Sequence, residues 1–167
     1  GTDGKAKMSK SLGNCIYLSD TSKEIKKKVN SMFTDPEHLQ ITDPGHVEGN
    51  VVFTYLDAFS NDEHFAKYLP EYANLDEMKD HYRRGGLGDG TCKKFLFNIM
   101  EEFLQPMRER RKQYEQNIPQ VYEILRKGSE AARAEAAKTL ADVRKAMKID
   151  YFDDADLIAE HTKKYQG

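Results

Sequence analysis

Residues 91–116 read TCKKFLFNIMEEFLQPMRERRKQYEQ, and this stretch decides the fold class of the chain. Its apolar side chains recur every three or four residues, which is the spacing of one face of an α-helix. Pro106 stands inside the pattern and is expected to kink the helix, because proline removes a backbone hydrogen bond. The stretch predicts a long helix with a broad buried face, made by Phe95, Leu96, Ile99, Met100, Phe103 and Met107.

The segments on the N-terminal side are also helical by pattern. A capping box at Thr21 and Glu24 begins a helix over residues 22–33, which ends before Pro36. Its apolar residues follow helical spacing: Ile25, Val29, Met32 and Phe33. Residues 34–49 are rich in Pro, Gly, Asp and Thr, and we interpret them as a connector. The single strand-like run of the chain is residues 15–18.

Polar caps predict the remaining helices. We expect Gly85 to close the helix that precedes residue 91, and Gly128 to end the helix that follows residue 117. Ser129 is then expected to start an alanine-rich helix, and Asp153 or Asp154 a final one. The other predicted caps are Asn50, Asn61, Asn74 and Asn117. The sequence therefore predicts an all-α protein whose helices form a bundle.

Composition excludes several classes of protein. The chain has 167 residues, with 26 Lys and Arg against 28 Asp and Glu, so its formal net charge is −2 and any nucleic acid must bind through local patches. No apolar run approaches the roughly 18 residues that a membrane helix needs, so we expect no membrane partner. Cys15 and Cys92 lie far apart in sequence, which favours a reducing compartment, and we expect a cytoplasmic protein.

The sequence begins with Gly1 rather than methionine, and its first methionine is Met8. We therefore expect it to be a piece of a longer protein, or a processed chain. Residues 7–11 read KMSKS, between glycines at positions 4 and 13. Ammonium and hydroxyl donors suit phosphate oxygens, so such a loop can close over a triphosphate and neutralise a leaving pyrophosphate. Lysine and serine are also common in solvated loops, and composition alone favours that plainer interpretation.

The order of these residues favours a function. Lys7 to Ser11 is identical to the KMSKS signature of class I aminoacyl-tRNA synthetases, and the residues Leu12-Gly13-Asn14 and Asp3-Gly4 resemble the same family. The following segment resembles bacterial-type tryptophanyl-tRNA synthetases. The features that carry this likeness are Ile16 to Leu18, Asp20, the helix over 22–33, Thr34-Asp35-Pro36, Gly88-x-Gly90-x-x-Lys93 and residues 104–110.

The resemblance implies roles for the loop. The parent enzyme would activate tryptophan with ATP and transfer it to its tRNA. Lys7 and Lys10 would be the catalytic residues that bind the triphosphate, and Lys10 would stabilise the departing pyrophosphate. Ser9 and Ser11 would hydrogen-bond phosphate or hold the loop, and Met8 would pack the loop down. Mg²⁺ would arrive with ATP, so we expect no metal site and no bound cofactor in this chain.

The resemblance also implies a division into domains. Residues 1–20 would be a mobile KMSKS loop at the end of the catalytic domain, and residues 21–48 a linker helix and connector. Residues 49–167 would be a C-terminal helical bundle that binds the tRNA anticodon region. The Rossmann core and the tryptophan pocket lie upstream in this family, so we expect this chain alone to be inactive. The parent is expected to be a homodimer.

Charge is unevenly distributed. Residues 1–31 carry a net charge of +4 and residues 93–112 a net charge of +3, whereas residues 57–80 carry −5. Clustered Lys and Arg bind phosphates, and aromatic rings stack on unpaired bases. The candidate tRNA-binding residues are Lys93, Lys94, Arg108, Arg110, Arg111, Lys112 and Tyr114.

Two alternatives remain open at this point. The chain could come from another class I synthetase, of the tyrosyl, methionyl or cysteinyl type. It could also be a non-catalytic helical module that binds tRNA or a protein. Two weaker patterns favour plain structure: the glycine-rich segment 85–90 follows no strand and is interpreted as an interhelical loop, and Asp35, His38, Asp43 and His46 lack the spacing of helical metal ligands.

Overall fold

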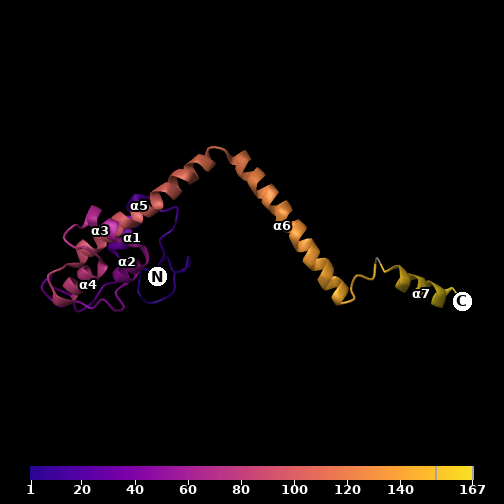
Figure 1. Cartoon of the computed structure of the whole chain (residues 1–167), viewed down its shortest axis with the longest axis horizontal. Coiled ribbons are helices and arrows are strands. Elements are labelled where there is room, and N and C mark those ends of the chain that lie inside the picture. The colour runs from indigo at the N-terminus through magenta and orange to yellow at the C-terminus, as the bar shows by residue number, and fades with distance from the viewer. Residues whose placement is uncertain (153, 167) are drawn as a thin grey trace. The chain divides into compact units, whose positions relative to one another are not determined.

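A computed structural model describes residues 1–152 and 154–166. Over this part of the chain there are seven α-helices and no strand, so the predicted all-α class is confirmed (Figure 1). The chain divides into two compact units, Gly1–Lys112 and Gln113–Gly167. The helices are α1 (Ser22–Asn30), α2 (Val51–Phe59), α3 (Asp62–Tyr68), α4 (Leu75–Arg84), α5 (Asp89–Glu115), α6 (Ile118–Ala146) and α7 (Ala155–Tyr165).

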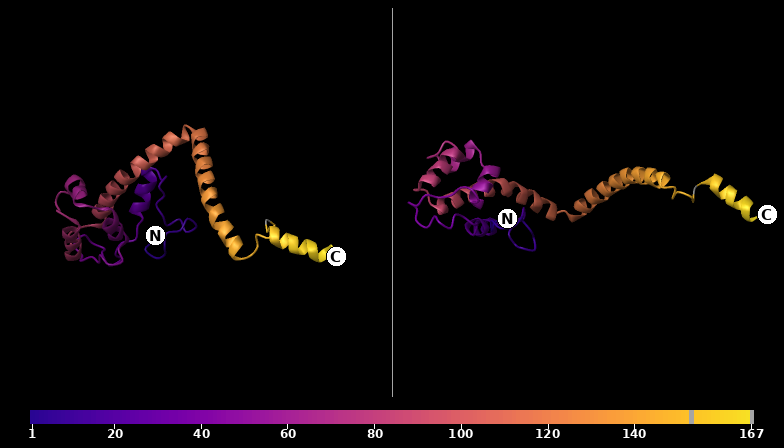
Figure 2. Two further views of the ribbon diagram at one scale, coloured as in Figure 1. Left: turned by 45° about the vertical axis from the view of Figure 1, so that its right-hand side comes forward. Right: turned by 90° about the horizontal axis from the view of Figure 1, so that it is seen from below.

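The first unit contains the hydrophobic core. The short helices α2, α3 and α4 gather around the first half of α5 (Figure 2). Tyr82 of α4 and Phe95 of α5 are almost completely buried there. The rest of the core is Ile25, Val29, Met32, Val47, Val51, Val52, Phe53, Leu56, Phe65, Leu69, Met78, Leu87, Cys92, Leu96, Ile99, Met100 and Leu104. The predicted inner face of α5 is therefore largely confirmed, although Phe103 is 46% exposed.

The caps of the short helices form as their sequences predict. Thr21 and Glu24 make a reciprocal capping box, in which the Thr21 backbone N–H donates to Glu24 Oε2 at 2.7 Å. The side chains of the predicted caps Asn50, Asn61 and Asn74 accept from backbone N–H groups two or three residues ahead. Gly85 closes α4 with a positive φ of 83°, which only glycine adopts easily.

The predicted helix over residues 22–33 is too long. Helix α1 ends at Asn30, and Ser31 is its C-cap. The backbone N–H of Phe33 donates to the carbonyl of Thr2 at 3.0 Å, so this segment leaves the helix to pair with the start of the chain. The strand-like run at residues 15–18 does not form a strand. An isolated extended run has no partner strand, and no strand is assigned in the described residues.

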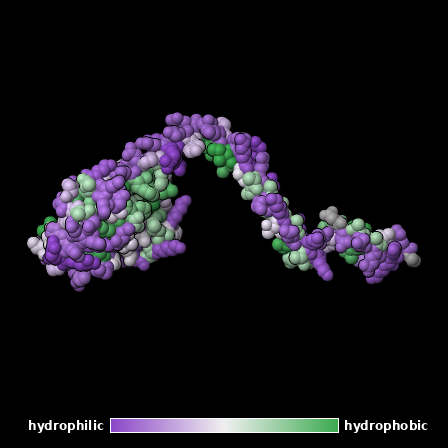
Figure 3. All heavy atoms as spheres, in the orientation of Figure 1, coloured by the Kyte–Doolittle hydropathy of each residue, from purple (hydrophilic) through white to green (hydrophobic). Residues whose placement is uncertain are grey.

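The second unit corrects another prediction. Helix α6 is continuous through Gly128 and Ser129, where we expected one helix to end and another to begin. A glycine costs only about 1 kcal/mol within a helix, and the alanine-rich residues that follow are strong helix formers, so the break does not form. Asn117 caps α6 as predicted. None of the residues of α6 or α7 is buried, and hydrophobic spots along α6 lie on its surface (Figure 3).

Helix α5 runs through Pro106 to Glu115, so the proline does not end it, and the bend expected there stays a prediction. Asp154 caps α7, whereas the alternative cap Asp153 lies outside the described residues. Within the described chain, no helix is long and apolar enough to cross a membrane.

Candidate functional site

The KMSKS loop is tied together by one buried side chain. The Asn14 side chain accepts from the backbone N–H of Ser9 at 2.8 Å and donates to both carboxylate oxygens of Asp3 at 3.2 Å. Its own backbone carbonyl accepts from the N–H of Thr2 at 2.8 Å. Asn14 is only 4% exposed, whereas its partners Ser9 and Asp3 are half-buried. The two ends of the loop are therefore joined through Asn14.

Glycines allow the chain to turn around this side chain. Gly4 and Gly13 have φ values of 66° and 65°, in the left-handed region that other residues avoid. The N–H of Gly13 donates to the carbonyl of Lys10 at 3.3 Å, which closes a turn around Ser11. The pKa of Asp3 lies below its ordinary value, mainly because its carboxylate accepts from the backbone N–H of Lys5. The loop thus has a defined shape although most of it is exposed.

The polar groups of the signature are exposed. Ser9 Oγ and Ser11 Oγ are 2.8 Å apart, so one hydroxyl donates to the other. Lys7 and Lys10 are exposed, and within the described residues neither has an acidic group within 4 Å of its ammonium. Two ammonium groups without counter-charges and two hydroxyls on one loop can bind an anion that carries several oxygens.

Met8 lies between the loop and the helices behind it. Its sulfur accepts from Tyr55 Oη of α2 at 3.4 Å, although 52% of Met8 remains exposed. A cavity of about 350 Å³ lies at this point, and its lining is almost entirely apolar. Met8, Ile16 and Leu18 line it from the loop side, Thr54, Tyr55, Ala58 and Phe59 from α2, and Met100, Phe103 and Leu104 from α5.

Helix α1 holds the C-terminal end of the loop through Asp20. Asp20, at the end of the loop, is 6% exposed and pairs with Lys28 of α1 at 2.5 Å. The same carboxylate accepts from the backbone N–H of Tyr17 at 2.8 Å, and the Lys28 ammonium lies 4.2 Å from the centre of the Tyr17 ring. Together with the bond between Phe33 and Thr2, these contacts fix both ends of the loop to α1 and the segment after it.

The basic residues predicted on α5 have different surroundings. Lys93 donates to the carbonyl of Asn30 at 3.0 Å, and Arg108 forms an ion pair with Glu101 while its guanidinium reaches the carbonyl of Asp20 at 3.5 Å. These two cations therefore brace α5 against α1 and the loop. Lys94, Arg110, Arg111 and Lys112 are exposed, and so is Tyr114, which belongs to the second unit.

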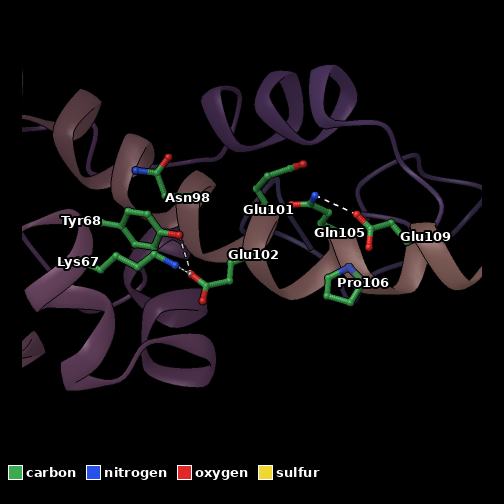
Figure 4. Close-up of a pocket in the computed structure, with 8 residues that line it drawn as sticks. All are labelled: Lys67, Tyr68, Asn98, Glu101, Glu102, Gln105, Pro106 and Glu109. Atoms are coloured by element: carbon green, nitrogen blue, oxygen red, sulfur yellow. Dashed lines mark hydrogen bonds and ion pairs between the residues drawn. The ribbon is translucent and has the colours of Figure 1, made fainter.

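The α3-facing side of α5 is acidic. Glu102 accepts from Tyr68 Oη at 2.6 Å and from Lys67 Nζ at 3.1 Å, and these bonds hold its pKa below the ordinary value (Figure 4). One turn further along, Gln105 donates to Glu109 at 3.0 Å. These residues, with Asn98, Glu101 and Pro106, line a polar cavity of about 360 Å³. An RNA phosphate would be repelled here.

Asp35, His38 and His46 make structural contacts, and within the described chain only that between Asp35 and His46 joins two of them. Asp35 accepts from the backbone N–H groups of Glu37 and His46 and pairs with the His46 ring at 2.8 Å. The rings of His38 and Tyr82 contact each other in a tilted arrangement, with 4.7 Å between their centres. In residues 1–152 and 154–166, no group of three or more Asp, Glu, His or Cys side chains is arranged to hold a metal ion.

Sequence reasoning missed three residues that shape the site. Asn14 and Asp3 belong to the segments that carry the resemblance but received no role, and Tyr55 was not singled out. Asn14 had a local signal, because an asparagine directly after a glycine is typical of a turn. The contact of Tyr55 with Met8 joins positions 47 residues apart, so no local pattern indicates it.

Known proteins resemble this chain along most of its length. A family model described as tRNA synthetases class I (W and Y) matches residues 1–105. The tryptophan–tRNA ligase of Clostridium longisporum is 56% identical over 154 residues, which is 92% of this chain and 42% of that protein. The tryptophan–tRNA ligase of Streptococcus pyogenes serotype M3 is 52% identical over 152 residues, which is 91% of this chain and 43% of the relative.

Solved structures agree with these relatives. The crystal structure of tryptophanyl-tRNA synthetase from Campylobacter jejuni is 27% identical, with a TM-score of 0.67 over 89% of this chain and 44% of that one. The same enzyme complexed with ADP and tryptophan matches with the same TM-score and covers 42% of its chain.

The predicted resemblance to bacterial tryptophanyl-tRNA synthetases is thus confirmed, and the chain spans about 42% of the length of the curated relatives it matches. The family model covers the KMSKS loop and helices α1 to α4 in full, together with most of α5. The chain belongs to the class I tRNA synthetases of the tryptophan and tyrosine group.

Proposed function

We propose that this chain is part of a tryptophan–tRNA ligase, in which the KMSKS loop acts on ATP and the helical part binds tRNA. The observation that carries the proposal is the exposure of the Lys7 and Lys10 ammonium groups. Both ammonium groups are exposed without an acidic partner in the described residues, on a loop whose ends are joined by Asn14. The tryptophan–tRNA ligases similar to this chain support tryptophan as the amino acid.

The chemistry of the loop is electrostatic. Activation of tryptophan by ATP releases pyrophosphate, and negative charge accumulates on the leaving oxygens in the transition state. Lys7 and Lys10 bind the triphosphate, and Lys10 stabilises the leaving pyrophosphate, so the lysines contribute most when that charge develops. Ser9 and Ser11 donate to phosphate oxygens or hold each other, since their hydroxyls are 2.8 Å apart. Met8 anchors the loop through Tyr55 and does no chemistry.

Mg²⁺ enters with ATP in this proposal. The KMSKS signature itself carries lysines rather than carboxylates, and the carboxylates of Asp3 and Asp20 are bound by Asn14 and Lys28, so the free donors of the loop fit phosphate oxygens and not a divalent cation. The surface of the helical part meets the tRNA anticodon region through Lys94, Arg110, Arg111 and Lys112, with Lys93 and Arg108 bracing α5. We place the whole enzyme in the cytoplasm and expect it to be a homodimer. The activity needs the remainder of the enzyme, so this chain alone is inactive.

The loop is tested in a chimera. This chain replaces the matching segment of the Clostridium longisporum relative, and ATP–pyrophosphate exchange is measured with tryptophan and, separately, with tyrosine. We expect exchange that depends on tryptophan, and Lys10→Ala is expected to lower its rate constant by about 100- to 1000-fold, as the loss of a group that stabilises transition-state charge does. Lys5→Ala is the matched control, because Lys5 is an exposed lysine on the same loop outside the signature.

Other outcomes would reject parts of the proposal. Equal rates for Lys10→Ala and Lys5→Ala would reject a catalytic role for the KMSKS signature. Exchange with tyrosine but not tryptophan would reject the amino-acid assignment. Exchange catalysed by this chain alone, above its own Lys10→Ala variant, would show that the rest of the enzyme is not needed.

A further inference from the structure

Helix α1 presents a row of cations that no role described above uses. Four of its nine residues are lysines, and Lys28 alone has an ion-pair partner in the described chain, namely Asp20. The other three, Lys23, Lys26 and Lys27, are exposed, and we call them the α1 lysine stripe. They were not among the tRNA-binding residues predicted from the sequence.

The stripe is a single face of the helix. Ile25 and Val29 point into the core and are fully buried. At 100° per residue, Lys23 and Lys27 lie opposite the buried residues, and Lys26 lies at the edge of that face, toward α5. Lys23 is three and four residues before the other two lysines, so its side chain neighbours both. No apolar side chain interrupts this face. The stripe is therefore a compact cationic surface on a helix whose other side is fixed by the core.

The stripe lacks counter-charges of its own. Glu24, the single acid of α1, is bound to the Thr21 hydroxyl and backbone N–H at 2.7 Å each. Within residues 1–152 and 154–166, the ammonium groups of the stripe have no acidic oxygen within 4 Å, and Lys26 lies 5.9 Å from the centre of the Phe97 ring. Like charges at these spacings destabilise a helix by a few tenths of a kcal/mol per pair.

Helix α1 connects the two sites of the proposed function. The segment after it bonds to Thr2 at the base of the KMSKS loop. On its other side it packs along α5, through Lys93 and the carbonyl of Asn30 at one end and Arg108 and the carbonyl of Asp20 at the other. A polyanion that contacts α5 and also reaches the loop meets the stripe on the intervening helix.

From this placement we propose that the α1 lysine stripe binds the phosphate backbone of tRNA. The inference rests on the proposed function, since the stripe would contact tRNA between the anticodon-binding surface and the ATP-binding loop. Lysine binds phosphate as a point charge without base specificity, so the stripe holds the RNA and reads no sequence. A folded protein partner fits less well, because the stripe offers no apolar anchor.

The test measures binding of a tryptophan tRNA transcript to the full chain between 0.05 and 0.3 M salt. The stripe variant carries Lys23→Gln, Lys26→Gln and Lys27→Gln. The matched control carries the same change in charge at exposed lysines of α6 and α7, as Lys145→Gln, Lys163→Gln and Lys164→Gln. A third variant, with Lys94→Gln, Arg110→Gln and Lys112→Gln, tests the surface of α5 in the proposed function. Circular dichroism establishes that each variant keeps its helix content.

We expect the stripe variant to bind at least about tenfold more weakly at 0.1 M salt, with the slope of log K against log salt reduced by about 2. The control variant should bind like the unmodified chain. If the slope is unchanged for the stripe variant but reduced for the α5 variant, tRNA binding by the stripe is rejected and the proposed function is left intact. No binding of tRNA by the unmodified chain would overturn both.

A poly-glutamate peptide of similar charge separates RNA from other polyanions. The proposal requires this peptide to bind the chain more weakly than tRNA at every salt concentration and to be affected less by the stripe substitutions. Equal affinity and an equal loss of slope would assign the stripe to acidic partners in general and reject RNA as its specific ligand.

Discussion

The two compact units of this chain differ in what stabilises their helices. Helix α2 of the first unit has nine residues, four of them buried in the core. Helix α6 of the second unit has 29 residues and buries none of them. Short helices are unstable alone in water, so α2 depends on the core around it. Helix α6 depends on interactions along its own length.

Those local interactions can be identified. Arg126 pairs with Glu123 and with Glu130, each at 2.7 Å, and Lys138 pairs with Glu135 at 3.0 Å. Pairs at these spacings add about 0.2–0.5 kcal/mol each, and alanine has the highest helix propensity. The comparison shows that helix content alone says little about a core, since the longer helix is the one without buried residues.

The largest expected effect comes from a cavity in the first unit. Leu96 of α5 is fully buried, so Leu96→Ala should lower the free energy of unfolding of that unit by about 2–5 kcal/mol. Leu140→Ala on α6 is the matched control, because Leu140 is 47% exposed, and it should cost less than about 1 kcal/mol. Urea unfolding monitored by hydrogen exchange resolves the two units.

Equal effects of these two substitutions would contradict the proposed difference in what stabilises the two units. A loss of several kcal/mol for Leu140→Ala would mean that the apolar residues of α6 are covered in solution. A small loss for Leu96→Ala would mean that the first unit has no tightly packed core.

Two glycines should respond in opposite directions. Gly85 has a φ of 83°, and a Cβ there would lie 2.3 Å from the carbonyl oxygen of Thr42, so Gly85→Ala should destabilise the first unit by more than about 1 kcal/mol. Gly128 lies inside α6 with open space around it, so Gly128→Ala should stabilise that helix by about 0.5–1 kcal/mol. Thermal unfolding followed by circular dichroism measures both, and effects of the same sign would contradict the assignment.

The sequence predicted features whose causes are local. Thr21 and Glu24 are three residues apart, and their capping box forms as expected. The same reasoning failed at Gly128, where the local signal for a helix end was outweighed by the helix formers around it. The end of α1 was also misplaced, because Phe33 bonds to Thr2, and that pairing exists only after the chain has folded.

In the candidate site, too, only features with local causes could be predicted from the sequence. The KMSKS signature was recognisable because five adjacent residues carry it. The role of Arg108 was not, since its partners are Glu101 on its own helix and the carbonyl of Asp20, 88 residues away. Composition indicates that an arginine is present, and only the fold decides whether it faces solvent or an acid. For this reason Lys94 and Lys112 are better candidates for RNA contacts than Arg108.

The smallest expected effect concerns pH, and it belongs to the first unit. Asp35 has a side chain only 4% exposed, and it pairs with His46, which is 65% exposed. Burial acts to raise the pKa of Asp35, but hydrogen bonds from the backbone N–H groups of Glu37 and His46 and from the His46 ring outweigh it, so the pKa lies below 3.8. The hydrogen bond and charge of Asp35 raise the pKa of His46 above 6.5.

The signs of these two shifts define a window of stability. The lowered pKa of Asp35 contributes stability above pH 3.8 that is lost as pH falls further, and the raised pKa of His46 contributes stability below pH 6.5 that is lost as pH rises. The first unit should therefore be less stable to urea at pH 8.5 than at pH 5.5, by a small amount because His46 is largely exposed to solvent. His46→Gln should abolish this difference, whereas His161→Gln on α7 should leave it unchanged. If the difference persists in His46→Gln, another group in the first unit is responsible, and the ion pair with Asp35 does not contribute to its stability.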